Sequence, residues 1–293
     1  MSGYNRVVTM AELFPVRFGT SGFSAGGWVG TFYPEKTKPK DYLGLYSQVL
    51  DTVEIDSTFY GTPATKTVEN WYKRTPDGFV FAAKVAESIT HDKCLKNCDE
   101  EFGEFISTMG NLKEKLGPLL FQFPYFSGSS GIDEGEFVER VESFLPKLPR
   151  EMQFAMEIRN KAWIGTRLLD TLHKHNVALA LIDHPKMPRP KRMVDADAIT
   201  ADFVYSRLLG DRYAIEELTT SWDKTVVDKS SEIDEWVEVT NVLRKRVPVY
   251  TFVNNHFDGH APATVAELKK RIYGTVPQKI KPVVESSGQM SLL

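Results

Sequence analysis

Short segments in which apolar residues recur at every second position, or run continuously, predict eight β-strands along the chain. A period of two indicates a strand, because successive side chains point to opposite faces. In the fifth such segment, Met156 falls on one face while Glu157 and Arg159 fall on the other. We predict strands at 16–22, 52–57, 79–85, 119–123, 153–160, 177–183, 203–208 and 249–254.

Between these strands, apolar residues spaced three and four apart predict helices. The strongest pattern runs from Phe102 to Leu116, and we expect that helix to end at Gly117-Pro118. Other helical patterns begin near 39 or cover about 68–73, 137–148, 168–172, 233–243 and 263–273. After the sixth strand no helix is predicted, and we expect a basic, proline-rich loop containing Lys186, Arg189, Lys191 and Arg192.

Strands that alternate with helices favour a parallel sheet covered by helices. Eight strands in 293 residues favour a single closed (β/α)8 TIM-type barrel over an open doubly wound sheet, and no glycine-rich dinucleotide fingerprint follows a strand. We therefore predict an N-terminal arm at 1–15, one barrel domain at 16–278 with long loops at its C-terminal face, and a flexible tail at 279–293.

Composition narrows the class of protein without naming a function. The net charge of −3 argues against a surface coated in basic residues, though not against a local basic patch. No apolar run approaches the roughly 20 residues of a membrane span, and no secretory signal is evident, so we expect a cytoplasmic protein with no membrane partner. Cys94 and Cys98 are four apart, unlike the two-residue gap of zinc and redox motifs, which predicts reduced, non-catalytic thiols.

Polar side chains stand near the C-terminal ends of these apolar strands. Both faces of a parallel α/β sheet are covered, so a charge there is either paired or faces a ligand pocket. In barrels of this class, sites are built at the C-terminal strand ends from several strands. The candidate inward-facing residues are Glu54, Asp56, Lys84, Gln122, Glu157, Arg159, Asp183, Arg207, Asn254 and His256.

The three cations of this set point to an anionic, phosphate-containing ligand, since arginine suits bidentate capture of phosphate. The candidate cationic ligand contacts are Lys84, Arg159 and Arg207. The candidate catalytic acids and bases are Glu157, Asp183, Glu54 and Asp56. The other candidate ligand contacts are Gln122, Asn254, His256, Tyr60 and Trp163, the last two as aromatic surfaces for stacking on bases or sugars.

Other interpretations of the same residues stay open. A salt-bridge network would plug the barrel without chemistry. A metal-dependent hydrolase would draw its ligands from His91, His184, His256, His260 and the carboxylates, although neighbouring cations would repel a metal, so no metal ligands are assigned and the cofactor is left unknown. Two carboxylates about 5–10 Å apart would allow glycosidase chemistry. Lys84 would form a Schiff base only with a depressed pKa, and we expect an ion pair instead.

Several motifs, taken together and in order, resemble one family. They are Gly19-Thr20-Ser21-Gly22-Phe23, 53–60, Lys84 with Ile89-Thr90-His91, Gln122-Phe123-Pro124, Glu157-Ile158-Arg159 with Trp163, and 254–262. They resemble the YecE-like proteins of bacteria and archaea, a family built on domain of unknown function 72. The resemblance implies a TIM-type barrel with a polar cleft at its C-terminal face and no settled reaction; likeness to endonuclease-IV-like barrels suggests DNA binding at the level of fold. The chain departs from the pattern at Leu209, where histidine is expected, and at Ala86, where proline is expected.

The end of the chain suggests a partner. Gln289–Leu293 resembles the short peptides that dock on bacterial sliding clamps, in which terminal hydrophobic residues anchor in a groove. With the basic stretch 186–192 contacting phosphate, it gives the alternative of a DNA-associated binding module recruited by a clamp, whose affinity would fall steeply with salt.

Overall fold

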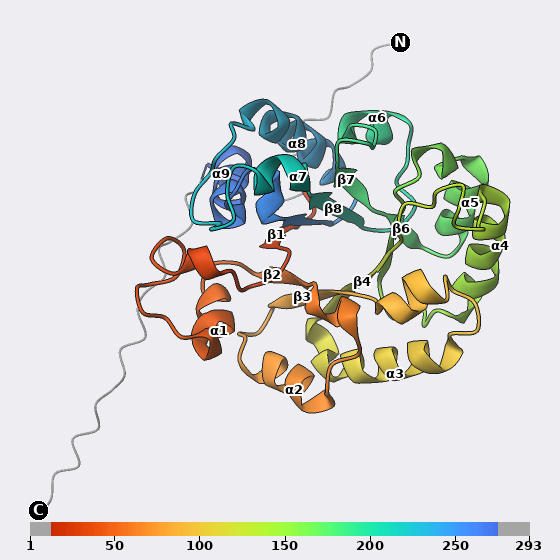
Figure 1. Cartoon of the computed structure of the whole chain (residues 1–293), viewed down its shortest axis with the longest axis horizontal. Helices are drawn as coiled ribbons and strands as arrows, with labels where there is room; N and C mark the ends of the chain where they lie inside the picture. Colours follow the sequence, from red (N-terminus) through yellow and green to blue (C-terminus); the bar gives the residue numbers. More distant parts are fainter. Residues whose placement is uncertain (1–12, 275–293) are drawn as a thin grey trace, which may run out of the picture.

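A computed structural model describes residues 13–274, and its strands run parallel in two sheets (Figure 1). The larger sheet has the order β2-β3-β4-β5-β6, and the smaller has the order β1-β9-β8-β7. The strands are β1 Val16–Thr20, β2 Thr52–Ile55, β3 Val80–Lys84, β4 Leu116–Gln122, β5 Phe154–Glu157, β6 Val177–Leu179, β7 Leu181–Asp183, β8 Val204–Leu208 and β9 Val249–Val253. The prediction of an α/β fold with parallel strands is confirmed.

The helices lie around the outside of the strands (Figure 1). They are α1 Tyr42–Tyr46, α2 Thr65–Lys73, α3 Asp99–Met109, α4 Glu134–Phe144, α5 Thr166–Lys174, α6 Pro190–Asp195, α7 Arg212–Glu216, α8 Ser230–Leu243 and α9 Ala261–Tyr273. Single helical turns also occur, at Gly26–Trp28, Pro39–Asp41, Ser57–Tyr60, Ser88–Asp92, Gly110–Lys115, Leu145–Lys147, Lys161–Trp163 and Asn255–Phe257. None of the described helices is long and apolar enough to cross a membrane.

The two sheets meet closely between β1 and β2. The Tyr46 hydroxyl accepts a hydrogen bond from the Thr20 amide (2.9 Å) and donates one to the Thr52 carbonyl (3.0 Å), so α1 ties the two strands together. A Cβ atom on Gly19 would lie only 2.3 Å from the Thr52 carbonyl oxygen, which explains the glycine. An isolated parallel β-bridge between Ser21 and Glu54 adds a further contact between the two sheets.

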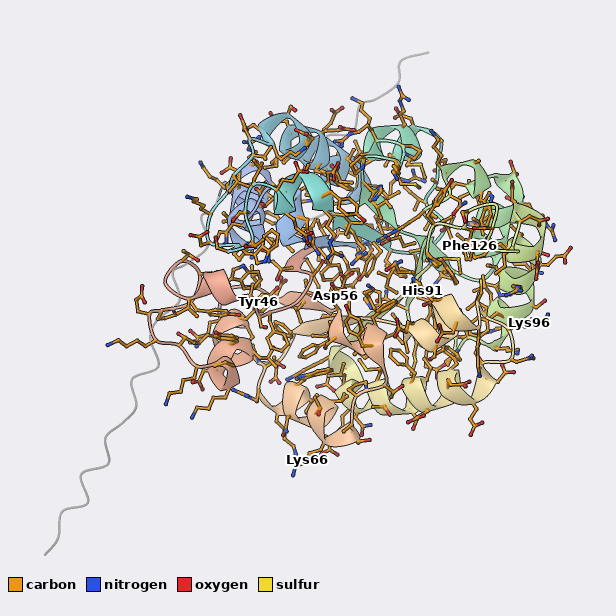
Figure 2. All side chains as sticks on the ribbon, viewed as in Figure 1. Tyr46, Asp56, Lys66, His91, Lys96 and Phe126 are labelled. Carbon is orange, nitrogen blue, oxygen red and sulfur yellow. The ribbon has the colours of Figure 1, made fainter. Side chains whose placement is uncertain are left out.

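Alternate residues of the strands form two apolar layers. Figure 2 shows side chains filling the space between strands and helices, and that outer layer includes Val177, Leu179 and Leu181. The inner layer has small side chains on one side and large ones on the other. Strands β3, β5 and β6 contribute alanines, whereas β8 and β9 contribute aromatic rings. Its buried members are Ala82, Leu120, Ala155, Ala178, Ala180, Ile182, Phe203, Tyr205, Leu209 and Phe252. Polar residues of the same inward phase therefore emerge together at the C-terminal strand ends.

Two predicted boundaries are wrong, for local reasons. Gly117-Pro118 does not end a helix but lies within β4, where the register with β3 shifts between Phe81 and Ala83. A shift of this kind tolerates proline, which has no amide hydrogen for the ladder. The predicted sixth strand is divided at Ala180, because β6 pairs with β5 whereas β7 pairs with β8.

The loop after β7 also differs from the prediction, because it contains the short helix α6. Pro190 occupies its first turn, where a missing amide hydrogen costs nothing and the fixed φ suits a helix. The predicted arm at 1–15 and tail at 279–293 lie largely or wholly outside the described residues, as does the clamp-like peptide Gln289–Leu293.

Candidate functional site

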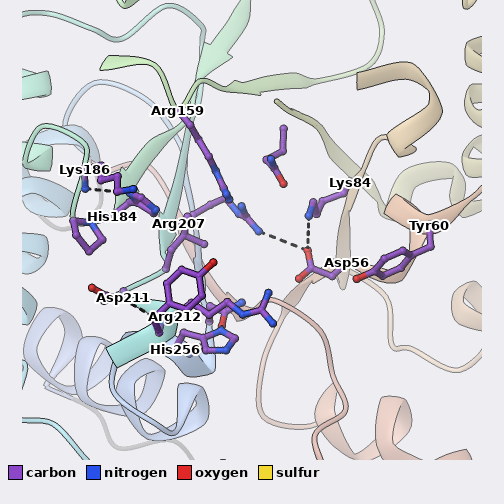
Figure 3. A pocket seen from close by; sticks show the side chains of 16 residues that line it. Asp56, Tyr60, Lys84, Arg159, His184, Lys186, Arg207, Asp211, Arg212 and His256 are labelled. Atoms are coloured by element: carbon purple, nitrogen blue, oxygen red, sulfur yellow. Dashed lines mark hydrogen bonds and ion pairs between the residues drawn. The ribbon is translucent and has the colours of Figure 1, made fainter. Parts of the chain in front are cut away.

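A cavity of about 530 Å³ opens where the C-terminal ends of the strands converge (Figure 3). Seven strands or the segments directly after them contribute to its wall, from β2 round to β9. Eight of the twelve predicted site residues line it: Asp56, Tyr60, Lys84, Gln122, Arg159, Arg207, Asn254 and His256. Most of the residues that the sequence predicts for the site therefore line one cavity.

Arg207, on β8, is the centre of the charged network beneath the cavity. Its side chain is 2% exposed, and all three of its guanidinium nitrogens meet carboxylates. Nε and Nη2 donate to the two oxygens of Glu54 at 2.8 and 2.6 Å, and Nη1 donates to Glu157 at 2.5 Å. Tyr205 adds a hydrogen bond to Glu54 at 2.6 Å. Because all three nitrogens already donate to carboxylates, the guanidinium has little capacity left for a ligand. Arg207 instead holds Glu54 and Glu157 together as the floor of the cavity.

The two glutamates of this network lie under the cavity and do not line it. Glu54 and Glu157 are both fully buried. Burial raises the pKa of Glu157, but Arg207 and then Arg159 outweigh it and hold that pKa at about 2. An acid or base must reach the reacting atoms, and neither Glu54 nor Glu157, both predicted to be catalytic, lines this cavity.

Arg159 and Lys84 are the cations that the network presents to the cavity. Arg159 donates through Nε to Glu157 at 2.9 Å, and this is the only side-chain hydrogen bond it makes within residues 13–274. Its side chain is 32% exposed, so Nη1 and Nη2 remain for a ligand. Lys84 Nζ lies 3.6 Å from Asp56 and 4.4 Å from the centre of the Phe59 ring, which makes the expected ion pair. Figure 3 shows Lys84 pointing from β3 into the cavity.

Asp56 is the one predicted catalytic carboxylate that lines the cavity. The side chain as a whole is 37% exposed, yet its Oδ1 is buried and accepts no hydrogen bond from any described residue. Burial and the neighbouring Glu54 raise the pKa of Asp56, while Lys84 and Arg207 oppose the rise. A carboxyl with a raised pKa at the wall of a cavity is suited to transfer a proton.

Three further basic residues line the cavity, and the alternation pattern could have identified one of them, His184. His184 follows Ala178, Ala180 and Ile182 in the inward phase and lines the wall. Burial and nearby Arg159 lower the pKa of His184, and its Nδ1 accepts from the Lys186 amide at 3.2 Å, which leaves the proton of the neutral ring on Nε2. Lys186 comes from the loop after β7 and Arg212 from the first turn of α7, and no period-two signal marks either of them.

The predicted inward-facing position of Asp183 is wrong. It is in phase with Leu179 and Leu181, which face the outer helices, and its Oδ2 accepts from Arg189 and from the Trp236 indole, both at 2.9 Å. The carboxylate therefore fastens β7 to α6 and α8. It does not reach the cavity.

Trp163 does not reach the cavity either. Its ring stacks on Phe126, with centroids 5.2 Å apart and planes 18° from parallel, and packs against Phe137. The predicted ligand contact is not made at this cavity, because the indole of the short turn at 161–163 packs on Phe126 of the loop after β4 and on Phe137 of α4.

The histidines do not assemble a metal site in the part of the chain that the structure describes, where no group of three or more His, Cys, Asp or Glu side chains converges. His256 already engages both ring nitrogens, with Asn254 at 2.7 Å and Glu216 at 3.0 Å. His260 Nδ1 meets the Trp222 carbonyl oxygen at 2.8 Å, and His91 Nδ1 meets the Thr90 hydroxyl at 2.9 Å. The metal-dependent hydrolase therefore stays a hypothesis without a ligand set.

The basic stretch 186–192 is less available than its sequence suggests. Arg189 pairs with Asp183 and Glu235, and Lys191 pairs with Glu238 at 2.7 Å. Because these partners neutralise two of its four cations, the stretch gives little support to a separate phosphate-binding surface, and Lys186 alone of the four lines the cavity.

The chain matches one family model over residues 17–286, described as a protein of unknown function, DUF72. This match covers most of the 293 residues. The chain belongs to the DUF72 family.

Relatives of this DUF72 protein agree with that assignment. The UPF0759 protein YecE of Escherichia coli K12 is 23% identical over 245 residues, covering 80% of this chain and 87% of its own. The crystal structure of a DUF72 protein from Thermotoga maritima is 28% identical, with a TM-score of 0.70 over 87% of this chain and 98% of its own. A D-tagatose 3-epimerase-like protein, 10% identical with a TM-score of 0.57 over 87% and 97% of the two chains, shares the fold alone.

This DUF72 protein departs from the expected pattern at Leu209, where histidine is expected, and the cavity wall is apolar there. Leu209 belongs to the inner apolar layer and lines the cavity beside Gly210. Gly210 has φ +68°, and a Cβ there would lie 2.1 Å from the His256 carbonyl oxygen. No histidine from the end of β8 therefore takes part in this site. Ala86, the other departure, is buried outside the cavity wall.

The raised pKa of Asp56 predicts that any anion bound beside Lys84 is held more tightly at low pH. As pH falls through that pKa the carboxylate is neutralised, its competition for Lys84 ends, and a dinucleoside monophosphate should bind more tightly, by up to roughly 5-fold. Asp56→Asn should show the tighter affinity already at neutral pH and a flatter profile. Isothermal titration of both proteins measures the difference. Since both keep His184, a parallel pH profile in the two proteins would contradict the assignment to Asp56.

Proposed function

We propose that the two sheets close into one eight-stranded barrel, in which β6 and β7 are two halves of one strand. We propose further that the cavity at its C-terminal end binds an anionic, phosphate-containing ligand. The observation that carries the proposal is the arrangement of Arg159. Its Nε is held by the buried Glu157 while its Nη atoms are left to the cavity, opposite the Lys84 side of the wall. Fixed guanidinium donors match the oxygens of a phosphate group.

The charge of the wall supports an anion over a cation. Five lining residues are cationic, Lys84, Arg159, Lys186, Arg207 and Arg212, against the two carboxylates Asp56 and Asp211. Asp211 is already occupied, because it accepts from the amides of Tyr213 and Ala214 at the start of α7. Arg207 is balanced by the buried glutamates and Arg212 by Glu216. Lys84, Arg159 and Lys186 then remain against Asp56, so cations are still in excess at the wall.

Catalysis on such a ligand would fall to Asp56. Of the four carboxylates predicted to be catalytic, it alone lines the cavity, and its raised pKa suits a group that both takes up and releases a proton. We therefore propose Asp56 as the proton-transfer residue of a reaction at or beside the phosphate, in which Lys84 and Arg159 hold the anion. Hydrolysis of a nucleic-acid phosphate is the reaction class to test first.

Binding of a deoxynucleoside 5′-monophosphate, followed by isothermal titration calorimetry, tests the proposal. Arg159→Ala removes charge-assisted hydrogen bonds and should weaken affinity roughly 10- to 100-fold. Arg167→Ala is the matched control, because Arg167 lies on the outer helix α5 and pairs with Glu142. Equal losses in both variants, or unchanged affinity in Arg159→Ala, would contradict the proposal.

A further inference from the structure

A second cavity, of about 440 Å³, lies beside the first and shares Arg159 and Lys186 with it. Its remaining wall consists of Tyr125, Asn160, Lys161 and Ala162. Every charged side chain in this lining is cationic, and no carboxylate from the described residues takes part. The side cavity, defined by these six residues, is therefore an anion-favouring compartment that continues from the central one.

The wall of the side cavity is held rigidly. Asn160 is buried, and its amide accepts from the Phe126 amide at 2.9 Å and donates to the Phe126 carbonyl at 2.8 Å. The Trp163 ring stacks on the Phe126 ring. These contacts lock the loop that bears Tyr125 to the turn that bears Lys161. Groups fixed before binding lose less entropy when a ligand arrives.

Each cavity also presents an exposed aromatic ring. The Tyr125 residue is 64% exposed at the side cavity, and Tyr60 is 79% exposed at the central one. Tyr213, also 79% exposed, is a second ring at the central cavity. Three exposed tyrosines gathered beside adjoining cationic cavities mark a surface for a partner. Cations that follow a phosphate backbone, alternating with aromatic platforms for the bases, are the features that bind single-stranded nucleic acid.

We infer that the two cavities form one extended site for a short single-stranded oligonucleotide. One phosphate lies between Lys84 and Arg159, and the next is held by Arg159, Lys161 and Lys186, with a base stacked on Tyr125. This inference rests on the proposed function and adds the class of ligand to it. It requires at least two linked nucleotides, which a mononucleotide cannot supply.

Fluorescence anisotropy with a random-sequence DNA octanucleotide, beside calorimetry with a deoxynucleoside monophosphate, tests the inference. The octanucleotide should bind at least roughly 10-fold more tightly than the monophosphate, since each stacked base adds about 1–3 kcal/mol. Lys161→Ala and Tyr125→Ala should each weaken octanucleotide binding roughly 5-fold or more and leave monophosphate binding unchanged. Tyr125→Phe, which keeps the ring, should bind like the wild type.

The control is Lys174→Ala, an exposed lysine at the far end of α5 that lines neither cavity. Equal affinities for the two probes, or octanucleotide binding insensitive to Lys161→Ala and Tyr125→Ala, would overturn the extended site while leaving monophosphate binding at Arg159 intact. A DNA duplex of eight base pairs is a third probe, and tighter binding of this duplex than of the single-stranded octanucleotide would overturn the assignment to a single-stranded ligand. Failure of both probes to bind would overturn the proposed function as well.

Discussion

Replacing Arg207 with alanine should destabilise the protein by about 3–5 kcal/mol, the largest effect we expect from any single substitution. The substitution leaves two buried carboxylates without the guanidinium that pairs with them. Glu54 and Glu157 are fully buried, and Arg207 donates three hydrogen bonds to them. Without the guanidinium, each carboxylate must stay charged without its main partner or take up a proton. Urea unfolding followed by circular dichroism measures the loss.

Arg167→Ala is the control for this experiment, because its pair with Glu142 is exposed and should contribute less than about 1 kcal/mol. If Arg207→Ala does not fold, adding Glu54→Gln and Glu157→Gln to it should restore folding, since the buried charges are then gone. A folded Arg207→Ala protein with wild-type stability would contradict the network, as would a triple variant less stable than Arg207→Ala.

Glu157→Gln should remove a large part of the acid sensitivity of the fold. The Glu157 carboxyl has a pKa of about 2 in the folded protein, below the ordinary glutamate value of 4.5. A depressed pKa stabilises the fold fully above the unfolded-state value, and this stabilisation is lost as pH falls from about 4.5 towards 2. Between about pH 7 and about pH 3 the wild type should therefore lose about 2 kcal/mol more stability than the variant.

Chemical denaturation at a series of pH values measures that difference. Glu139→Gln, on the exposed face of α4, is the matched control and should lose stability with acid as the wild type does. A Glu157→Gln protein with a pH–stability curve parallel to the wild type would show that Glu157 does not sit between two arginines as described.

Much of the site follows from alternation alone. Glu54, Lys84, Glu157 and Arg207 belong to the inward phase of four different strands, so a period of two predicts that they meet. Alternation does not say which of them reaches solvent. Depth along the strands decides this: Arg207 and the glutamates form a paired floor, whereas Arg159 lies beyond the end of β5 and emerges above it.

The errors have equally specific causes. Asp183 stands at a strand end like the other predicted charges, but its phase matches that of Leu181 and places it among the outer helices. The position of Trp163 depends on a turn that no periodic pattern encodes. Lys186 and Lys161 belong to loops, whose path is fixed by long-range contacts such as the hydrogen bonds between Asn160 and Phe126. Such contacts join residues 34 apart and leave no local signal.

The central claim is that Arg159 and Lys84, supported by the buried carboxylates, hold a phosphate group in the cavity. A crystal soaked in tungstate, a heavy mimic of phosphate, tests this most directly through its anomalous scattering. We expect one strong peak within hydrogen-bonding distance of the Arg159 Nη atoms and Lys84 Nζ, and its disappearance in Arg159→Ala. An empty cavity with peaks only on outer-surface cations such as Arg167, or a central peak that survives Arg159→Ala, would contradict the account.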